Sequence, residues 1–247
     1  METAMIYGRH PVLEALGPKV DKLYIQKGAK DGSIGKIRRV AKELGIFVQE
    51  REKSRLDEMT AGANHQGVVC FVSDFRYAEI DEMLALAEAR GEDPLLVLLD
   101  SVHDPHNLGA VIRSALAMGA HGVIIPKHRA ASVNATVYKT SAGAVDEMLV
   151  AKVTNLNRTI EELKQKNIWV YGADAGQAPL YTADLTGPIA IVVGNEGDGI
   201  AEKTKEHTDV LLSIPMPGGF ESLNASVAAS IFLYETLRQR DGKQKKV

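Results

Sequence analysis

From Pro94 onward, short runs of apolar residues alternate with segments whose apolar positions recur every three to four residues. The runs are LLVLLD, GVIIP, MLVAKV, IWVYGA, IAIVVG and VLLSIP, at 95–100, 122–126, 148–153, 168–173, 189–194 and 210–215. Such runs predict buried strands, and their alternation with helices predicts an α/β fold: a mostly parallel sheet with helices on both faces. Ligands of such sheets bind beyond the carboxyl ends of the strands.

The earlier part of the chain mixes helical and extended patterns on a smaller scale. Helices are expected at 9–16, 34–45 and 55–60, and strands at 20–26, 46–50 and 67–73. These elements predict a small α/β domain over residues 1–76. Residues 77–93, YAEIDEMLALAEARGED, are acidic and helical, and we interpret them as a linker to a larger domain at 94–247.

Composition narrows the setting in which the protein works. Of the 247 residues, 45% are hydrophobic, as in an ordinary globular protein, and the single cysteine, Cys70, excludes an internal disulfide and a multi-cysteine zinc site. The amino terminus has no apolar signal segment, and the longest apolar runs are too short to span a bilayer. We therefore expect a cytoplasmic protein without membrane association.

The net charge of −3 gives no support to a simple polybasic nucleic-acid binder, but the charge is uneven. Residues 1–76 hold 13 Lys and Arg against 10 Asp and Glu, whereas residues 77–93 hold 1 against 6. Local basic clusters, such as Lys127, His128 and Arg129, are candidates for contact with a phosphate backbone. A solvated surface is the alternative for each cluster.

The loop after the first strand of the larger domain, DSVHDPHN at 100–107, leads into a helix that contains Arg113. Asn107 is a candidate helix cap. An arginine so near the end of the strand can hold a phosphate or carboxylate with its planar fork, and a surface arginine with a packed stem is the alternative. His103 and His106 have no clustered carboxylates beside them, so we predict no metal site.

The loop GNEGDG at 194–199 follows the strand IAIVV. Its three glycines permit positive φ angles and a close approach of a ligand to the backbone. The GxxGxG spacing is neither the dinucleotide fingerprint nor a Walker motif, which argues against a nucleotide-dependent oxidoreductase. Glu196 would repel a phosphate and suits a cationic or hydroxyl-bearing ligand, or a neighbouring arginine.

Residues 211–230, LLSIPMPGGFESLNASVAAS, combine an apolar strand, a loop broken by two Pro and two Gly, and a polar helix start. The bent loop leaves backbone amides free. One Ser or Asn suffices to cap a helix, whereas this start offers Ser222, Asn224 and Ser226. A ligand site and a plain helix cap both remain open for this stretch alone.

Three motifs together resemble those of the SpoU (SPOUT) RNA ribose 2'-O-methyltransferases. They are NLGAVIR (107–113), VVGNEGDG (192–199) and IPMPGGFESLNASVA (214–228), in this order. In addition, YGRHPVLEAL (7–16) and HQGVV (65–69) resemble the small substrate-binding domain of the bacterial 23S rRNA guanosine 2'-O-methyltransferases. The likeness covers nearly the whole chain.

The resemblance implies a carboxyl-terminal trefoil knot, which the general rule against knots would not have predicted. It also implies S-adenosylmethionine as cofactor, bent within the knot and held largely by backbone groups. By motif match, the cofactor contacts are expected at Gly194, Asn195, Gly199, Ile214, Met216 and Leu223.

The implied reaction moves a methyl group from the cofactor to a ribose 2'-hydroxyl, with Arg113, Asn107, Glu196, Ser222 and Asn224 as catalytic residues. A guanidinium is not expected to deprotonate in a protein. We therefore expect Arg113 to bind the adjacent phosphate and stabilise a developing alkoxide, and Glu196 to orient Arg113 or Asn107. The identity of the proton acceptor stays open.

The resemblance further implies a homodimer whose site is completed across the interface, and an RNA partner gripped by the small domain. Guanosine in 23S rRNA is the favoured substrate, and a nucleotide of tRNA is the alternative. A non-catalytic RNA-binding protein of the same fold is a third possibility. It would be expected to lack some of Arg113, Glu196, Ser222 and Asn224, all of which are present.

Overall fold

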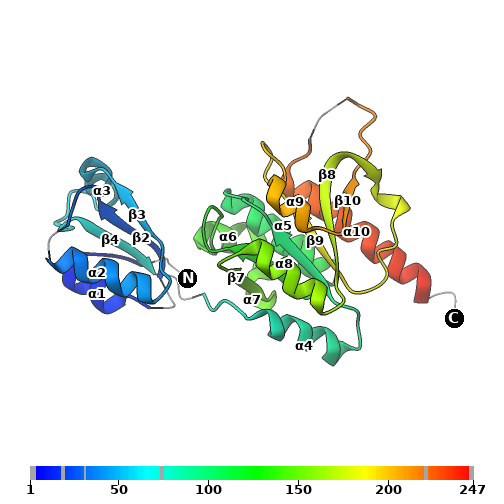
Figure 1. Ribbon diagram of the computed structural model, residues 1–247, viewed down its shortest axis with the longest axis horizontal. Helices are drawn as coiled ribbons and strands as arrows, with labels where there is room; N and C mark the ends of the chain where they lie inside the picture. The colour runs from blue at the N-terminus through cyan, green and yellow to red at the C-terminus, as the bar shows by residue number, and fades with distance from the viewer. Residues whose placement is uncertain (1–3, 18–19, 31, 73–74, 220–221, 245–247) are drawn as a thin grey trace. The chain divides into compact units, whose positions relative to one another are not determined.

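The computed structural model describes residues 4–17, 20–30, 32–72, 75–219 and 222–244. The chain divides into two compact units, a small unit at Met1–Arg76 and a large unit at Tyr77–Val247 (Figure 1). Among the helices of the described residues, none has the length and apolar character needed to cross a membrane.

The small unit is built on a sheet whose described strands follow the order β1-β4-β2-β3. Strand β4 runs antiparallel to β1 and β2, while β3 pairs parallel to β2. Its core is apolar, with Val12, Leu23 and Ile37 fully buried between the sheet and the helices. Its elements are β1 (Ala4–Tyr7), α1 (Arg9–Ala15), β2 (Val20–Gln26), α2 (Gly32–Glu43), β3 (Val48–Arg51), α3 (Lys53–Met59) and β4 (Val68–Val72).

In the large unit, six strands of the described chain form one sheet in the order β10-β8-β9-β5-β6-β7. Every neighbouring pair is parallel, which confirms the predicted parallel sheet. Because the strands share one direction, they end on one rim of the sheet, called here the C-terminal rim, and begin on the opposite N-terminal rim. The strands are β5 (Leu95–Leu99), β6 (Gly122–Pro126), β7 (Val150–Val153), β8 (Trp169–Pro179), β9 (Ile189–Val193) and β10 (Val210–Ser213).

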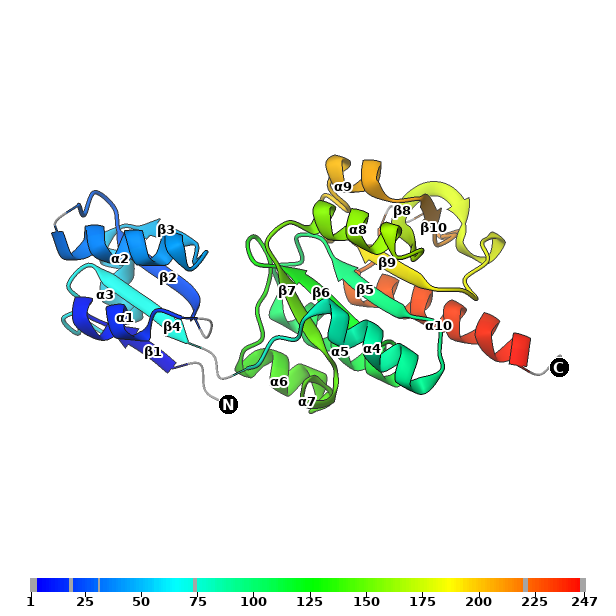
Figure 2. The same cartoon turned by 60° about the horizontal axis from the view of Figure 1, so that its bottom comes forward.

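Helices cover both faces of this sheet, as predicted (Figure 2). On one face Met83, Ile160 and Leu163 pack with Leu96 and Leu98 of β5, so α4 and α8 share this layer. On the other face α10 lies against α5 and β9. The helices are α4 (Ile80–Arg90), α5 (Pro105–Ala117), α6 (Ala135–Ser141), α7 (Ala144–Glu147), α8 (Leu156–Gln165), α9 (Glu202–His207) and α10 (Ala225–Gln244), with a 3-10 turn at Leu180–Thr182.

Residues 77–93 pack onto the large unit. Ala78 forms a parallel bridge with Ala151 of β7, and Met83 of α4 is fully buried. A Cβ atom at Gly122 would overlap the side chain of Met83, so α4 lies directly on the start of β6. The acidic segment is therefore a helical layer of this unit.

Strand β8 is longer than the expected strand at 168–173. It continues to Pro179, and its register with β10 jumps from Gly172–Leu211 to Ala178–Leu212. Such a jump marks a bulge, and residues 173–177 bow out of the ladder. The Ser213 hydroxyl donates to the carbonyl of Gln177 at 2.7 Å, which holds the bulge at the C-terminal rim.

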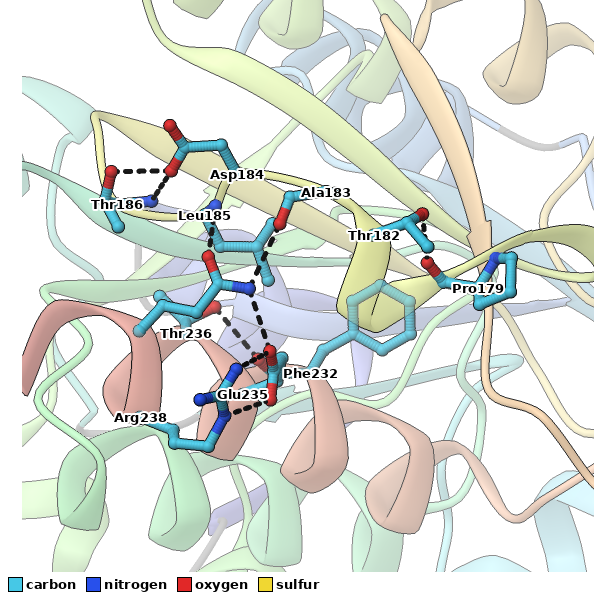
Figure 3. A network of polar contacts seen from close by, with 11 residues as sticks. Pro179, Thr182, Ala183, Asp184, Leu185, Thr186, Phe232, Glu235, Thr236 and Arg238 are labelled. Atoms are coloured by element: carbon cyan, nitrogen blue, oxygen red, sulfur yellow. Dashed lines mark hydrogen bonds and ion pairs between the residues drawn. The ribbon is translucent and has the colours of Figure 1, made fainter. Parts of the chain in front are cut away.

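The N-terminal rim is closed by the last turns of α10. The side-chain amide of Gln239 accepts from the Leu185 N–H at 2.9 Å and donates to the Ala183 carbonyl at 3.1 Å. Figure 3 shows Ala183 and Leu185 facing this helix, beside the ion pair of Glu235 with Arg238. The loop that leads into β9 is thereby fixed to α10.

The predicted knot depends on the path of the loop between β10 and α10. Residues 220 and 221 of this loop lie outside the described residues, so the knot stays a prediction.

Candidate functional site

A pocket of about 320 Å³ opens at the C-terminal rim, between the loops that follow β8, β9 and β10. Parallel α/β sheets bind their ligands at this rim. The pocket walls include Ala173 and Asp174 of the β8 bulge and Phe232 of α10. All six residues predicted to contact a cofactor also line the pocket: Gly194, Asn195, Gly199, Ile214, Met216 and Leu223.

The loop after β9 owes its shape to two glycines and one asparagine. The Asn195 side-chain oxygen accepts from the N–H groups of Gly197 and Asp198, both at 2.8 Å, and its backbone pairs with Gly199. Gly199 has φ +69°, and a Cβ atom at Gly194 would overlap the Gly199 carbonyl group. The glycine pattern is therefore explained first by this tight turn, which brings backbone groups to the pocket surface.

Asp100, at the end of β5, holds this loop in place. The sequence did not single out this residue. Its side chain is buried, and its two carboxylate oxygens accept from the Ala201 N–H at 2.9 Å and the Ser101 hydroxyl at 3.0 Å. Its own N–H donates to the Val193 carbonyl at 2.8 Å. Through its backbone N–H and its carboxylate together, Asp100 ties the end of β5 to both ends of the glycine loop. A charged residue directly after LLVLL was the available signal.

Three predicted catalytic residues form one hydrogen-bonded cluster beside the pocket. The Asn224 amide nitrogen donates to the Asn107 side-chain oxygen at 2.9 Å and to a Glu196 carboxylate oxygen at 3.4 Å. The Asn107 amide donates to the same Glu196 oxygen. Glu196 therefore fixes the orientation of both amides, and Asn107 is buried. Of the two partners expected for Glu196, the contact is with Asn107.

Helix starts bring two of these residues into place. The Asn224 side-chain oxygen accepts from the Ser226 N–H at 2.9 Å and its hydroxyl at 2.6 Å, so Asn224, one of three polar residues offered by this helix start, caps α10. The expected Asn107 cap is wrong: Asp104 accepts from the His106 N–H at 2.9 Å, and Pro105 occupies the first helical turn. Proline suits that position because its fixed φ is helical, which shifts Asn107 into the helix.

Ser222 and Arg113 lie differently. Ser222 lines the pocket and is exposed. Arg113 is exposed on α5, stands outside the pocket wall, and forms no ion pair with any described residue. The structure thus joins Asn107, Glu196 and Asn224, places Ser222 in the adjoining wall, and leaves the Arg113 guanidinium available to a ligand from solution.

The pocket wall is negatively charged. Asp174, Glu196 and Asp198 line it, whereas its described lining holds no Lys or Arg side chain. The Asp174 carboxylate pairs with Lys205 at 3.1 Å, and hydrogen bonds to Glu202 and Asp174 raise the Lys205 pKa. Among the described residues, no group of three or more His, Cys, Asp and Glu side chains could hold a metal ion.

A parallel α/β sheet with a backbone-lined pocket and a polar cluster at its C-terminal rim is typical of a protein that binds a small ligand for chemistry. Residues 94–234 match the SpoU rRNA Methylase family, and residues 5–78 match a family described as RNA 2'-O ribose methyltransferase substrate binding. The chain belongs to the SpoU rRNA Methylase family. The resemblance seen in the sequence motifs is thereby confirmed.

Individual relatives support the same assignment. The chain is 42% identical over 239 residues to the putative TrmH family tRNA/rRNA methyltransferase YacO of Bacillus subtilis, which covers 96% of each chain. The SpoU methyltransferase AviRb of Streptomyces viridochromogenes, in complex with AdoMet, aligns with a TM-score of 0.62 at 26% identity, covering 96% of this chain and 90% of that one. A structure concerned with 2-OH methylation of C/U34 on tRNA aligns with a TM-score of 0.55 at 25% identity, covering 61% and 98%.

Proposed function

We propose that this protein transfers a methyl group from S-adenosylmethionine to a ribose 2'-hydroxyl of RNA, with guanosine in 23S rRNA as the favoured target. The observation that carries the proposal is the junction of two features: a pocket lined by backbone groups and the Asn107–Glu196–Asn224 cluster at its side. The match of residues 5–78 to a 2'-O ribose methyltransferase substrate-binding family supports the ribose as acceptor.

The pocket fits the cofactor in size and charge. A cavity of about 320 Å³ is within the range that holds a ligand of this size. Backbone groups of Gly194, Ile214 and Leu223 would hold it, and the carboxylates of Asp174 and Asp198 favour a positively charged ligand over a phosphate. Bound S-adenosylmethionine supplies a methyl group on a cationic sulfur, so no lysine is needed in the pocket.

The cluster residues would position the acceptor. Glu196 accepts from both asparagine amides and so fixes them in one orientation, which leaves the second amide hydrogen of Asn107 and the Ser222 hydroxyl to orient the ribose hydroxyl. Arg113, which is exposed, would bind the phosphate next to the target and stabilise negative charge on the attacking oxygen. The hydroxyl proton leaves to an acceptor that we do not assign to one residue.

The small unit would grip RNA away from the target. It has a polar cleft of about 460 Å³ whose lining includes Arg9, Lys53, Asn64 and Gln66. Buried His65 shapes one wall, because its ring contacts Asp57 at 2.9 Å and accepts from the Gly67 N–H at 2.9 Å. Amide and cationic side chains of this kind suit the base edges and phosphates of unpaired RNA.

A homodimer is part of the proposal. Val227 and Tyr234 on α10 are 46% and 59% exposed, which is unusual for large apolar side chains on a helix that also packs against its own sheet. A second copy of the chain would cover them. Sedimentation that gives a monomer at micromolar concentration would contradict a site completed across this interface.

The decisive experiment compares two RNA pools. Purified protein is incubated with S-adenosylmethionine labelled in the methyl group and with either a 23S rRNA transcript or unfractionated tRNA. We expect label in the 23S transcript, and none when the mapped target carries a 2'-deoxyribose. Label in tRNA alone would assign the alternative substrate, and label in neither, with normal cofactor binding, would contradict the proposed activity. Mapping 2'-O-methyl positions in cells lacking the protein tests the same assignment in vivo.

A further inference from the structure

The strand order separates the two substrates of the proposed reaction. The pocket lies over β10, β8 and β9, and the Asn107–Glu196–Asn224 cluster lies where the loops after β9 and β5 meet. Beyond β5 the next strand is β6. Because the pocket occupies the side of the cluster toward β8 and β10, the loop that follows β6 is on the side left for the second substrate.

This loop, residues 127–134, is anchored by its second half. The Ala131 N–H donates to the Val102 carbonyl at 2.8 Å, and the Val133 N–H donates to the Tyr77 hydroxyl at 3.0 Å. Both residues are buried. The bond between Ala131 and Val102 connects the loop to the segment that precedes Asn107. The loop is therefore held next to the start of the helix that carries this cluster residue.

The first half of the loop presents positive charge to solvent. Lys127 and Arg129 are exposed, and Arg129 holds φ +57°, a left-handed conformation that non-glycine residues seldom adopt. Positive φ angles of this kind gather at functional sites, where surrounding contacts impose them.

Several other exposed or half-buried cations of the large unit are paired with carboxylates. Lys164 pairs with Asp209 at 3.1 Å, and Lys205 and Arg238 also have carboxylate partners. For Lys127 and Arg129, no ion pair is found among the residues the structure describes. Lys152, at the end of β7, donates to the Ser132 hydroxyl at 2.7 Å and so adds its charge to the base of the same loop.

The pKa of His128 is sensitive to the charges around the loop. Burial lowers its pKa, and the nearby Lys127 and Lys152 cations lower it further. One exposed carboxylate, Asp104, lies in the neighbouring loop, where it caps α5. Lys127, Arg129 and Lys152 thus place three cations in and beside this loop, in a chain of net charge −3.

We propose that Lys127 and Arg129 form a phosphate track, which binds the backbone of the acceptor RNA strand next to the target nucleotide. The inference rests on the proposed function, because it presupposes an RNA substrate at the cluster. Neighbouring strands lie about 4.8 Å apart, so the loop after β6 begins about 10 Å from β9, close enough for a phosphate near the target. Such contacts fix the register of the strand without reading its sequence.

The test compares two double variants that remove the same charge. Lys127→Ala with Arg129→Ala removes the track. Arg90→Ala with Lys166→Ala removes two exposed cations from the ends of α4 and α8, at the N-terminal rim. For each protein, binding to a 23S rRNA transcript and to unfractionated tRNA is measured across a range of KCl concentrations, and S-adenosylmethionine binding is measured by calorimetry.

For the track variant we expect roughly five- to tenfold weaker binding to the RNA that the wild type methylates, and a salt slope shallower by about 1.4 in log–log form, since each lost phosphate contact on a single strand contributes about 0.7. Cofactor affinity should stay within twofold, and the rim variant should match the wild type. Equal losses in both variants, or an unchanged slope in the track variant, would overturn the proposal.

The experiment can contradict the phosphate track and the proposed methyl transfer independently. If the wild type binds and methylates RNA while the track variant behaves like it, only the track is wrong. A wild type that binds cofactor but methylates neither RNA contradicts the proposed function itself.

Discussion

The two rims of the large sheet carry polar networks that differ in what they bond to. At the C-terminal rim, Asn107, Glu196 and Asn224 bond chiefly to one another beside an open pocket. At the N-terminal rim, Arg240 donates to the carbonyls of Asp93, Pro94 and Gly187 at 2.8, 3.2 and 2.8 Å. The network at the C-terminal rim links side chains to one another, whereas Arg240 at the N-terminal rim donates to backbone carbonyls.

This difference indicates that the C-terminal rim, and not the N-terminal rim, has polar groups that could bind a ligand. Burial lowers the pKa of both Arg240 and His121 at the N-terminal rim. The two terminal nitrogens of Arg240 bond to the chain, while its buried Nε has no partner among the described residues. His121 is fully buried, accepts from the Leu95 N–H at 3.1 Å and contacts Glu92 at 3.0 Å. Hydrogen bonds of buried groups within the chain stabilise the fold, whereas hydrogen-bond donors that have no partner beside a pocket can bind a ligand. Substitutions at the two rims should therefore separate folding from activity.

The largest effect is expected for Gly194→Ala at the C-terminal rim. The added methyl group would overlap the Gly199 backbone, so the glycine loop must shift and several backbone contacts to the cofactor are lost together. We expect at least roughly 100-fold weaker binding of S-adenosylmethionine by calorimetry, because each lost hydrogen bond is worth about 1 kcal/mol. Gly187→Ala at the other rim is the control, since nothing lies within 4 Å of the added atom. Binding within threefold of wild type in Gly194→Ala would contradict the loop geometry.

Arg113→Ala should reduce turnover by about 10²–10³-fold, in the range found when one charge-stabilising donor is removed. Cofactor affinity should not change, because Arg113 stands outside the pocket wall. Single-turnover kinetics with the substrate RNA measure the effect. Arg113→Lys keeps the charge but loses the planar fork, and we expect it to recover only part of the rate. Near-normal turnover in Arg113→Ala would remove this residue from the site.

Arg240→Ala tests the opposite rim. Three backbone carbonyls lose their donor, and we expect the free energy of unfolding to fall by about 3 kcal/mol in urea titration. Turnover per folded molecule should be unchanged below the transition. On the same helix, Arg238→Ala removes an exposed, solvent-screened ion pair with Glu235 and should lower the free energy of unfolding far less than Arg240→Ala does. Equal effects of the two variants would show that the buried arginine has no special role.

The smallest effect concerns pH. Because burial lowers the His121 pKa in the folded state, protonation favours the unfolded chain, whose histidine titrates near its ordinary value of 6.5. Stability is therefore full above that pH and decreases as pH falls below it toward the folded pKa. His121→Asn keeps an acceptor for the Leu95 N–H and should flatten this dependence. His10→Asn, at an exposed histidine, should leave it unchanged. The same acid slope in His121→Asn would assign the pH effect elsewhere.

Local patterns predicted much of the fold. Six apolar runs became the six described strands of the large sheet, because residues buried on both faces of a sheet must be apolar throughout. The continuation of β8 to Pro179 was missed, since ADAGQ has neither apolar alternation nor β-branched residues. Strand β1, whose four residues are all at least partly exposed, was also missed.

The sequence motifs selected residues that lie together in the structure, but they did not predict how these residues contact one another. Motif resemblance selected Asn107, Glu196 and Asn224, yet their hydrogen bonds join residues 89 and 117 positions apart, which no local pattern reveals. The helix cap was placed at Asn107 and belongs to Asp104, because both residue types cap helices well. Asp100 was missed because a lone aspartate after a strand has many structural uses.

Helix α10 also sets an order of events during synthesis. It follows every strand of the large sheet in the chain, its first turn is capped by Asn224, and its last turns hold the opposite rim through Gln239 and Arg240. A ribosome adding about 5–20 residues per second therefore exposes a nearly complete sheet seconds before the helix that finishes both rims. Until that helix docks, the nascent chain can neither hold the N-terminal rim closed nor assemble the asparagine–glutamate cluster, so methylation competence and global stability should arise in the same step.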